Sequence, residues 1–104
     1  MSNSTRPSEI RTPVSHNVYF DGYVQSLGLS TEKGPATLGV MKKGAYQFNT
    51  SSPETITVVS GKMSTRIKDG DWRFHQEEET FEIPSHAAFD IICETDVAYM
   101  CYYR

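Results

Sequence analysis

The chain has 104 residues, a formal net charge of −3, three histidines and two cysteines. That length is sufficient for one domain with one hydrophobic core and too short for a second. The slightly acidic balance offers no extended basic surface, so neither a nucleic acid polymer nor an anionic membrane is an expected partner. No apolar run approaches the roughly 20 residues that span a bilayer, and residues 1–12 contain no signal-peptide core, which together indicate a cytoplasmic location.

The secondary structure is predicted to be almost entirely β. Residues 1–15 are rich in Ser, Thr, Pro and Arg and lack hydrophobic periodicity, so we expect a flexible N-terminal arm. Over residues 16–104, short runs of β-branched and aromatic residues alternate with turn signals, which predicts one domain without a helix. The predicted strands cover residues 18–24, 36–41, 45–49, 54–59, 62–67, 72–75, 80–83, 88–93 and 97–103.

Glycine-containing turns separate several of these strands. They lie at residues 42–44, 60–62 and 69–71 and predict antiparallel hairpins. The sequence between the strands is too short for crossover helices. We therefore expect an all-β domain, a small antiparallel barrel or jelly roll, which also protects the strand edges from pairing with other chains.

The cysteines and histidines do not form a metal-binding pattern. Cys93 and Cys101 lie in separate apolar strands without a Cys-x-x-Cys spacing, which predicts two reduced, buried thiols. His16 adjoins the arm, and His75 is expected to be exposed at the end of a strand. That leaves His86 as the one histidine inside a motif. Because a catalytic metal usually takes three or more protein ligands, we expect no metal.

The alternation of side chains along a strand identifies candidate binding residues. Glu54 shares a strand face with Ile56 and Val58, so it would lie at the mouth of the barrel if those two are in the core. A carboxylate in that position requires a partner or a ligand, since burying an unpaired charge is costly. Aromatic and polar side chains on other strands are expected to line the same interior, namely Tyr46, Phe48, Thr50, Phe89 and Tyr99.

A purely structural interpretation of these residues is also open. Glu54 could pair with a nearby cation, His86 could do no more than fill the turn after Pro84, and the aromatic rings could simply form the core. The cations within reach of such a pairing are Lys42, Lys43 and Arg66.

Several blocks of sequence follow one another in an order and at distances that match a known family. The blocks are Asn17-Val-Tyr19-Phe20-x-Gly22-x-Val24, Gly39-Val40-Met41, Gly44-x-Tyr46-x-Phe48-x-Thr50, Pro53-Glu54, Val58-x-Ser60-Gly61, Phe81-x-Ile83-Pro84-x-His86-x-x-Phe89 and Tyr99-x-Cys101. Over about residues 16–104 the chain resembles the small cupin-fold pyrimidine/purine nucleoside phosphorylases of bacteria. The resemblance implies a single small cupin-like barrel or jelly roll.

The resemblance also implies an activity. A protein of this kind is a metal-independent enzyme that cleaves purine and pyrimidine nucleosides with inorganic phosphate, releasing the free base and ribose 1-phosphate. Phosphate is a co-substrate, no cofactor is expected, and the implied assembly is a homodimer.

Roles for individual residues follow from that activity as a hypothesis. Glu54 would accept hydrogen bonds from the ribose hydroxyls and stabilise the cationic ring, and His86 would protonate the leaving base or bind phosphate. Tyr46, Phe48 and Phe89 would stack on the base or the sugar, with Tyr99 lining the same pocket. Phosphate would be held by Thr50 together with Arg66 or Arg104.

Arg104 is a candidate phosphate ligand because it could replace an arginine that this chain lacks and some relatives have. Some relatives carry an arginine where Tyr102 stands, and Arg104 lies two residues further along the same strand face.

Two other functions stay open at this point. The protein could be a non-catalytic, metal-free cupin that binds a sugar or nucleoside, in which case ligands would raise its melting temperature without turnover. It could also be a metal-dependent cupin enzyme with scattered ligands, whose activity a chelator would abolish.

Overall fold

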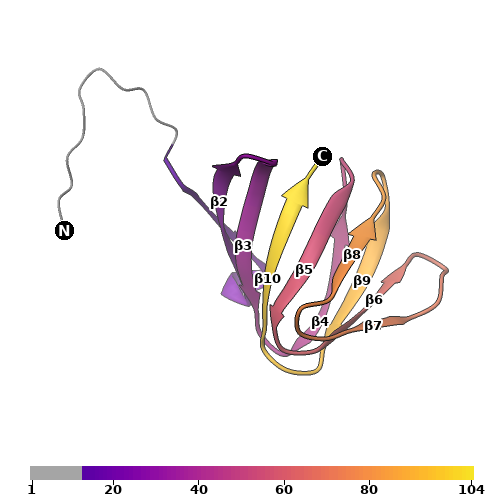
Figure 1. Ribbon diagram of the computed structural model, residues 1–104. Coiled ribbons are helices and arrows are strands. Elements are labelled where there is room, and N and C mark those ends of the chain that lie inside the picture. The colour runs from indigo at the N-terminus through magenta and orange to yellow at the C-terminus, as the bar shows by residue number, and fades with distance from the viewer. Residues whose placement is uncertain (1–12) are drawn as a thin grey trace, which may run out of the picture.

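A computed structural model describes residues 13–104, so the greater part of the predicted arm, residues 1–12, lies outside the described residues. Within 13–104 the chain consists of β-strands, turns and one short 3-10 element, η1 (Phe20–Gly22) (Figure 1). The strands are β1 (Ser15–Tyr19), β2 (Val24–Thr31), β3 (Gly34–Met41), β4 (Gly44–Asn49), β5 (Glu54–Ser60), β6 (Met63–Ile67), β7 (Arg73–His75), β8 (Thr80–Ile83), β9 (Ala88–Cys93) and β10 (Val97–Tyr103).

The strands form two antiparallel sheets. The larger sheet has six strands in the order β1-β2-β3-β10-β5-β8, and the smaller has four in the order β4-β9-β6-β7. Because the two hydrogen-bonded ladders remain separate, the domain is a jelly-roll sandwich rather than a closed barrel. The predicted all-β, jelly-roll class is confirmed.

Two of the predicted hairpin turns are corners between the sheets. Residues 42–43 connect β3 of the larger sheet to β4 of the smaller, and residues 61–62 connect β5 to β6 in the same way. Gly61 has a φ of +98°, and a side chain there would meet the carbonyl oxygen of Asp96. The prediction of hairpins at 42–44 and 60–62 is therefore wrong. The sequence did not distinguish the two cases because a hairpin and a tight corner between sheets require the same turn residues. The turn at 69–71 does join a hairpin, β6 with β7.

The first predicted strand, residues 18–24, is interrupted. Phe20 and Asp21 have positive φ angles of 49° and 54°, and Gly22 follows at 90°. The chain therefore turns back sharply, and β2 pairs with β1 in antiparallel register from Tyr19–Val24 to Ser15–Gly28. Ser15 belongs to β1, so the fold begins within the range predicted as arm. The sequence prediction missed β2 beyond Val24 because residues 25–31 are mostly small or polar.

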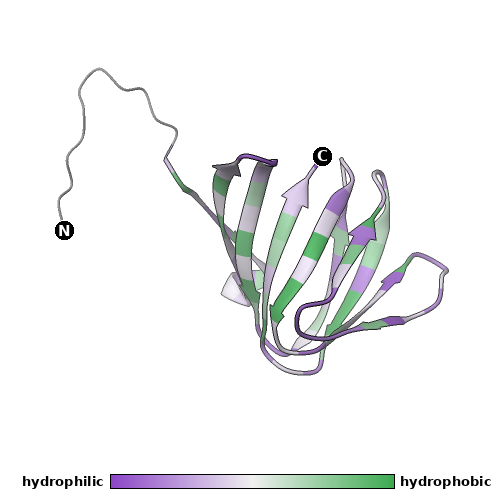
Figure 2. Ribbon diagram, viewed as in Figure 1, coloured by the Kyte–Doolittle hydropathy of each residue, from purple (hydrophilic) through white to green (hydrophobic). Residues whose placement is uncertain are grey.

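The core lies between the sheets. Apolar and polar residues alternate along many of the strands, as Figure 2 shows, and the inward apolar set is buried. Both cysteines are free and buried, as predicted. The fully or nearly fully buried members include Val24, Met41, Ile56, Val58, Met63, Phe81, Ile83, Phe89, Ile91, Cys93, Val97 and Cys101.

His75 is part of this core, contrary to the prediction that it is exposed. Its exposed fraction is 5%, and a hydrogen bond of 2.8 Å links its Nε2 to Oγ1 of Thr65. The imidazole stacks on Phe81 with ring centroids 3.7 Å apart, and burial lowers the pKa of His75. One ring face and Nε2 of His75 thus have partners in the core, which the position of His75 at the end of a short strand did not reveal.

No helix among residues 13–104 has the length and apolar character needed to cross a membrane.

Candidate functional site

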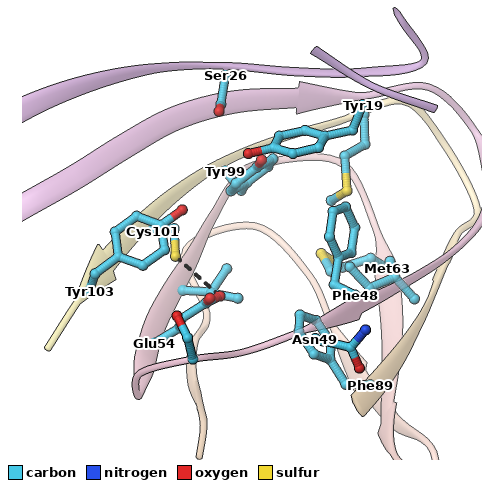
Figure 3. Close-up of a pocket in the computed structure, with 14 residues that line it drawn as sticks. Tyr19, Ser26, Phe48, Asn49, Glu54, Met63, Phe89, Tyr99, Cys101 and Tyr103 are labelled. Carbon is cyan, nitrogen blue, oxygen red and sulfur yellow. Dashed lines mark hydrogen bonds between the residues drawn. The ribbon is translucent and has the colours of Figure 1, made fainter. Parts of the chain in front are cut away.

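A pocket of about 280 Å³ lies between the two sheets. That volume is near the lower end of the range for small-molecule sites. Both sheets contribute side chains, and Figure 3 shows the polar ones Glu54, Cys101 and Tyr103 opposite the apolar ones Phe48 and Met63. The lining residues are Tyr19, Ser26, Met41, Phe48, Asn49, Ser51, Glu54, Ile56, Met63, Phe89, Ile91, Tyr99, Cys101 and Tyr103.

Glu54 faces this pocket, as the alternation along its strand predicted. It is the first residue of β5, where it pairs with Tyr103 of β10 on one side and Ile83 of β8 on the other. Its Oε1 accepts a hydrogen bond of 3.5 Å from the thiol of Cys101. Burial raises the pKa of Glu54, and the thiol hydrogen bond opposes that effect only in part.

The alternative that Glu54 pairs with a nearby lysine or arginine does not hold. The amine of Lys42 and the backbone N–H of Lys43 both bind the carboxylate of Asp96, at 3.1 Å and 2.8 Å. The guanidinium of Arg66 pairs with Asp90 at 3.1 Å. Among residues 13–104, Glu54 therefore has no cationic partner, and its carboxylate faces the pocket in an arrangement that a ligand with hydroxyl groups would satisfy.

Alternate residues of β10 provide the other polar groups of this side. Tyr99, Cys101 and Tyr103 point inward, and the Tyr103 hydroxyl forms a hydrogen bond of 3.0 Å with Oγ1 of Thr37. Burial raises the pKa of Tyr99 and of Cys101 to about 12 each and also raises that of Tyr103. All three groups are therefore neutral near pH 7, and the two hydroxyls can donate hydrogen bonds.

Aromatic rings form the opposite wall. Phe48 of β4 and Phe89 of β9 are cross-strand partners and stack at 5.9 Å with an interplanar angle of 28°. Tyr19 of β1 meets Phe48 edge-on at 6.0 Å. Flat rings in this arrangement can bind planar groups without reading their hydrogen-bonding edges.

Two predicted pocket residues have structural contacts instead. The hydroxyl of Tyr46 donates a hydrogen bond of 2.6 Å to the carbonyl of Lys42, and its ring packs against Phe20. The hydroxyl of Thr50 donates to the carbonyl of Pro84 and accepts from the N–H of Ala87. Neither residue is among the lining residues, although both are buried, so they stabilise the loops around the pocket rather than its surface.

Arg66, one of the two predicted phosphate ligands, lies on the outside of the four-stranded sheet. Its guanidinium binds Asp90 and covers the ring of Trp72 at 4.6 Å. Along β6 its side chain alternates with that of Thr65, which is buried in the core. A phosphate in the pocket is therefore out of its reach, and the position differs from the one we expected because the sequence did not show which sheet face Arg66 occupies.

His86 and Arg104 both lie beside the loop of residues 50–53. The N–H of His86 donates to the carbonyl of Thr50, and the N–H of Arg104 donates to the carbonyl of Pro53, each at 3.0 Å. The same loop contributes Ser51 to the pocket lining. Both side chains are exposed and outside the pocket lining, so these two predicted residues lie beside the loop and not in the interior.

Sequence reasoning missed several lining residues. Cys101 and Tyr103 follow Tyr99 at spacings of two, so alternation along β10 could have found them. Ile91 follows Phe89 at the same spacing on β9. The others depend on how strands pair, which the sequence did not show: Tyr19, Ser26, Met41, Asn49, Ser51 and Met63.

The only ionisable side chain of clear charge among the described lining residues is acidic. From the residues that the structure describes, the lining takes the carboxylate of Glu54 and no lysine, arginine or histidine. In the part of the chain that the structure describes, no three His, Cys, Asp or Glu side chains gather as metal ligands would.

Two facing antiparallel sheets with a ligand-sized pocket between them define a small cupin-type jelly roll. Solved structures support this class. A protein of unknown function from Vibrio parahaemolyticus superposes with a TM-score of 0.84 at 32% identity, covering 89% of this chain and all of that one. A putative ethanolamine utilization protein from Salmonella typhimurium has the same fold, with a TM-score of 0.67 at 14% identity over 90% of this chain and 95% of that one.

The chain belongs to the pyrimidine/purine nucleoside phosphorylase family, whose model matches residues 14–103. A Vibrio cholerae protein with that name is 44% identical over 89 residues, which are 85% of this chain and 94% of the relative. The family resemblance read from the sequence is thus confirmed.

Proposed function

We propose that the protein is a broad-specificity nucleoside phosphorylase that cleaves purine and pyrimidine nucleosides with inorganic phosphate. The observation that carries this proposal is the carboxylate of Glu54, which has no cationic partner in the described part of the chain, in a pocket with an aromatic wall. Nucleosides combine a hydroxylated sugar with a flat base, and the pocket has a matching group for each. Membership of a family named for this activity supports the same conclusion.

The reaction requires charge stabilisation at the sugar. A phosphate oxygen forms a bond to C1′ of the ribose as the bond from C1′ to the base nitrogen breaks. The bonding pair leaves on the base, which takes up the proton that the attacking hydrogenphosphate gives up, and positive charge develops on the ribose ring in the transition state. Ionised Glu54 would bind the ribose hydroxyls and stabilise that charge, as carboxylates do in glycoside cleavage. Each of these steps proceeds without a metal or redox cofactor.

Phosphate would bind at the rim of the pocket. Arg104 and His86 flank the loop of residues 50–53, and that loop brings the hydroxyl of Ser51 to the pocket. Arginine suits bidentate recognition of phosphate, and an imidazole N–H can donate to a third oxygen. The rim is also the place where phosphate avoids close approach to Glu54, a group of like charge.

Removal of the Arg104 side chain should affect phosphate selectively. We expect Arg104→Ala to raise the KM for phosphate about tenfold, the loss of one charged hydrogen bond, with the KM for uridine unchanged. Steady-state kinetics with each substrate varied in turn measure both constants. Arg73→Ala, an exposed arginine on the edge strand β7, is the matched control. Equal phosphate KM values in all three proteins would remove Arg104 from the site.

A direct assay separates this function from the non-catalytic alternative. Chelator-treated protein is incubated with uridine or adenosine, with and without phosphate, and free base is measured by chromatography. We expect base release from both nucleosides only when phosphate is present. Nucleosides that raise the melting temperature without any base release would show a binding protein instead, and activity abolished by the chelator would show a metal enzyme.

We also propose that the protein is a homodimer that pairs through the outer face of the six-stranded sheet. Six aliphatic side chains on this sheet have exposed fractions from 44% to 58%: Val18, Leu27, Leu29, Leu38, Val40 and Val59. Leu27 and Leu38 are cross-strand partners, so the apolar surface is continuous across β2 and β3. Such a face can pack on its own copy about a two-fold axis, which removes it from water.

A charge at the centre of this face should separate the subunits. We expect Leu38→Asp to be monomeric in sedimentation at micromolar concentration, with the wild-type protein dimeric. Phe74→Asp, at a 50% exposed position in β7 of the other sheet, should remain dimeric. A monomeric wild-type protein would contradict the proposed dimer. A dimer that persists in Leu38→Asp and is lost in Phe74→Asp would contradict the proposed interface.

A further inference from the structure

The two ends of the pocket differ in chemistry. At one end lie Glu54 and Tyr103, which are cross-strand partners beside the loop of residues 50–53. At the other end lies Met41, whose partner on β10 is Val97, six residues away from Tyr103. Six residues of extended strand span roughly 20 Å. An elongated ligand with one polar and one apolar part therefore has a defined orientation in this pocket.

The apolar end has a methionine from each sheet. Met41 ends β3 of the larger sheet, and Met63 begins β6 of the smaller. Met63 pairs with Cys93, the end of β9 that lies farthest from the loop of residues 50–53. The exposed fractions of Met41 and Met63 are 3% and 0%. Both thioethers therefore lie at the deep end of the same pocket.

One aromatic ring stands in the same row of residues as Met41. Tyr19 pairs with Val24, which pairs with Met41, so these three residues form one row across β1, β2 and β3. The Tyr19 ring contacts Phe48 from the opposite sheet, as Figure 3 shows. Aromatic rings from both sheets therefore line the same pocket as the two methionines.

Methionine makes an adaptable wall. Its side chain is unbranched with three rotatable bonds, and its polarizable sulfur packs well against aromatic faces. A pocket that ends in two such side chains can change its length by rotamer adjustment, whereas leucine or isoleucine would give a fixed boundary. The structure thus has a physical device for accepting flat groups of one ring or two.

The geometry of the proposed reaction determines which part of the substrate lies at this end. In displacement at C1′, the attacking phosphate and the departing base lie on opposite sides of that carbon. With phosphate at the rim beside Ser51 and the ribose at Glu54, the base must point away from the rim. We propose that Met41 and Met63 form an adaptable base subsite and determine the range of bases that the protein accepts. This inference rests on the proposed phosphorylase function.

The test compares a two-ring and a one-ring substrate. In the double variant Met41→Leu/Met63→Leu, we expect kcat/KM for adenosine to fall roughly tenfold while kcat/KM for uridine stays within a factor of two, since one misplaced methylene group in an apolar pocket has an effect of that size. Met100→Leu is the matched control, because Met100 lies between the inward residues Tyr99 and Cys101 and so faces outward. Equal losses for both substrates, or an unchanged ratio, would overturn the proposal.

A binding measurement separates failure of this inference from failure of the proposed function. If the wild-type protein releases no base from either nucleoside, the phosphorylase function fails, and calorimetric titration with free adenine and free uracil still tests the subsite. Weaker adenine binding in the double variant, with uracil binding retained, would support it. Unchanged adenine binding in the variant, or none in the wild-type protein, would overturn it.

Discussion

Glu54→Gln is expected to lower kcat for phosphorolysis on the order of 100-fold without unfolding the protein. A loss of this size is typical when one preorganised group that stabilises charge in the transition state is removed. Glutamine retains the size of the side chain and its ability to accept a hydrogen bond from the Cys101 thiol. It lacks the negative charge that would stabilise the cationic ribose ring. Glu82→Gln is the matched control, because Glu82 follows the inward Phe81 on β8 and is exposed. A Glu54→Gln variant with wild-type kcat would remove Glu54 from the mechanism.

The same residue gives a pH dependence with a defined sign. Burial raises the pKa of Glu54 above its unfolded value, so the folded state binds this proton more tightly than the unfolded state does. This group's contribution to stability is therefore fully favourable below the unfolded pKa and is lost as pH rises through the folded pKa. Turnover, which requires the ionised form, increases over that range. We expect Glu54→Gln to be more stable than the wild-type protein at pH 7 and to lose that advantage at pH 4 in thermal melts.

Gly39→Ala is expected to destabilise the fold by about 1–3 kcal/mol, the usual cost of overpacking, and to reduce activity at the same time. A β-carbon on Gly39 would lie 2.5 Å from both Cζ and the hydroxyl oxygen of Tyr99. The φ angle of Gly39 is outside the left-handed region, so alanine there suits the backbone and conflicts with the tyrosine ring alone. The tyrosine would have to leave its place in the pocket wall.

A double-mutant cycle tests this explanation. In a Tyr99→Ala background the obstructing ring is absent, so Gly39→Ala should lower the free energy of unfolding by less than about 0.5 kcal/mol. Differences of that size are within the deviation from additivity seen for residues that do not interact. Chemical denaturation of the four proteins gives the coupling energy. An equal loss of stability in both backgrounds would show that Gly39 is needed for another reason, and unchanged activity in Gly39→Ala would show that Tyr99 is not a substrate contact.

Alternation within single strands predicted part of the pocket lining correctly. The inward positions of Glu54 and Phe48 follow from the strand period alone, and the burial of Cys101 follows from the apolar strand that contains it. The turn signals also located most of the strand boundaries. These inferences succeed because each depends on neighbours within one short run of residues, where steric preferences act directly.

The remaining features depend on contacts between distant strands. Arg66 and Glu54 are equally plausible site residues by composition, and only the pairing of β6 with β9 shows that Arg66 binds Asp90 on the outer face. His75 is buried because β7 places it against Phe81, and Met41 joins Met63 only when the two sheets come together. Register between strands is a tertiary property, and the alternation of one strand leaves it undetermined.

The central claim is that phosphate attacks a nucleoside held between the two sheets. Phosphorus NMR of the wild-type protein with uridine and phosphate tests it most directly, because the signal of ribose 1-phosphate is distinct from that of inorganic phosphate. We predict one equivalent of ribose 1-phosphate for each uracil released, with both products reduced in parallel by Glu54→Gln. Uracil formed together with free ribose would show hydrolysis, and a spectrum unchanged after prolonged incubation would contradict catalysis altogether.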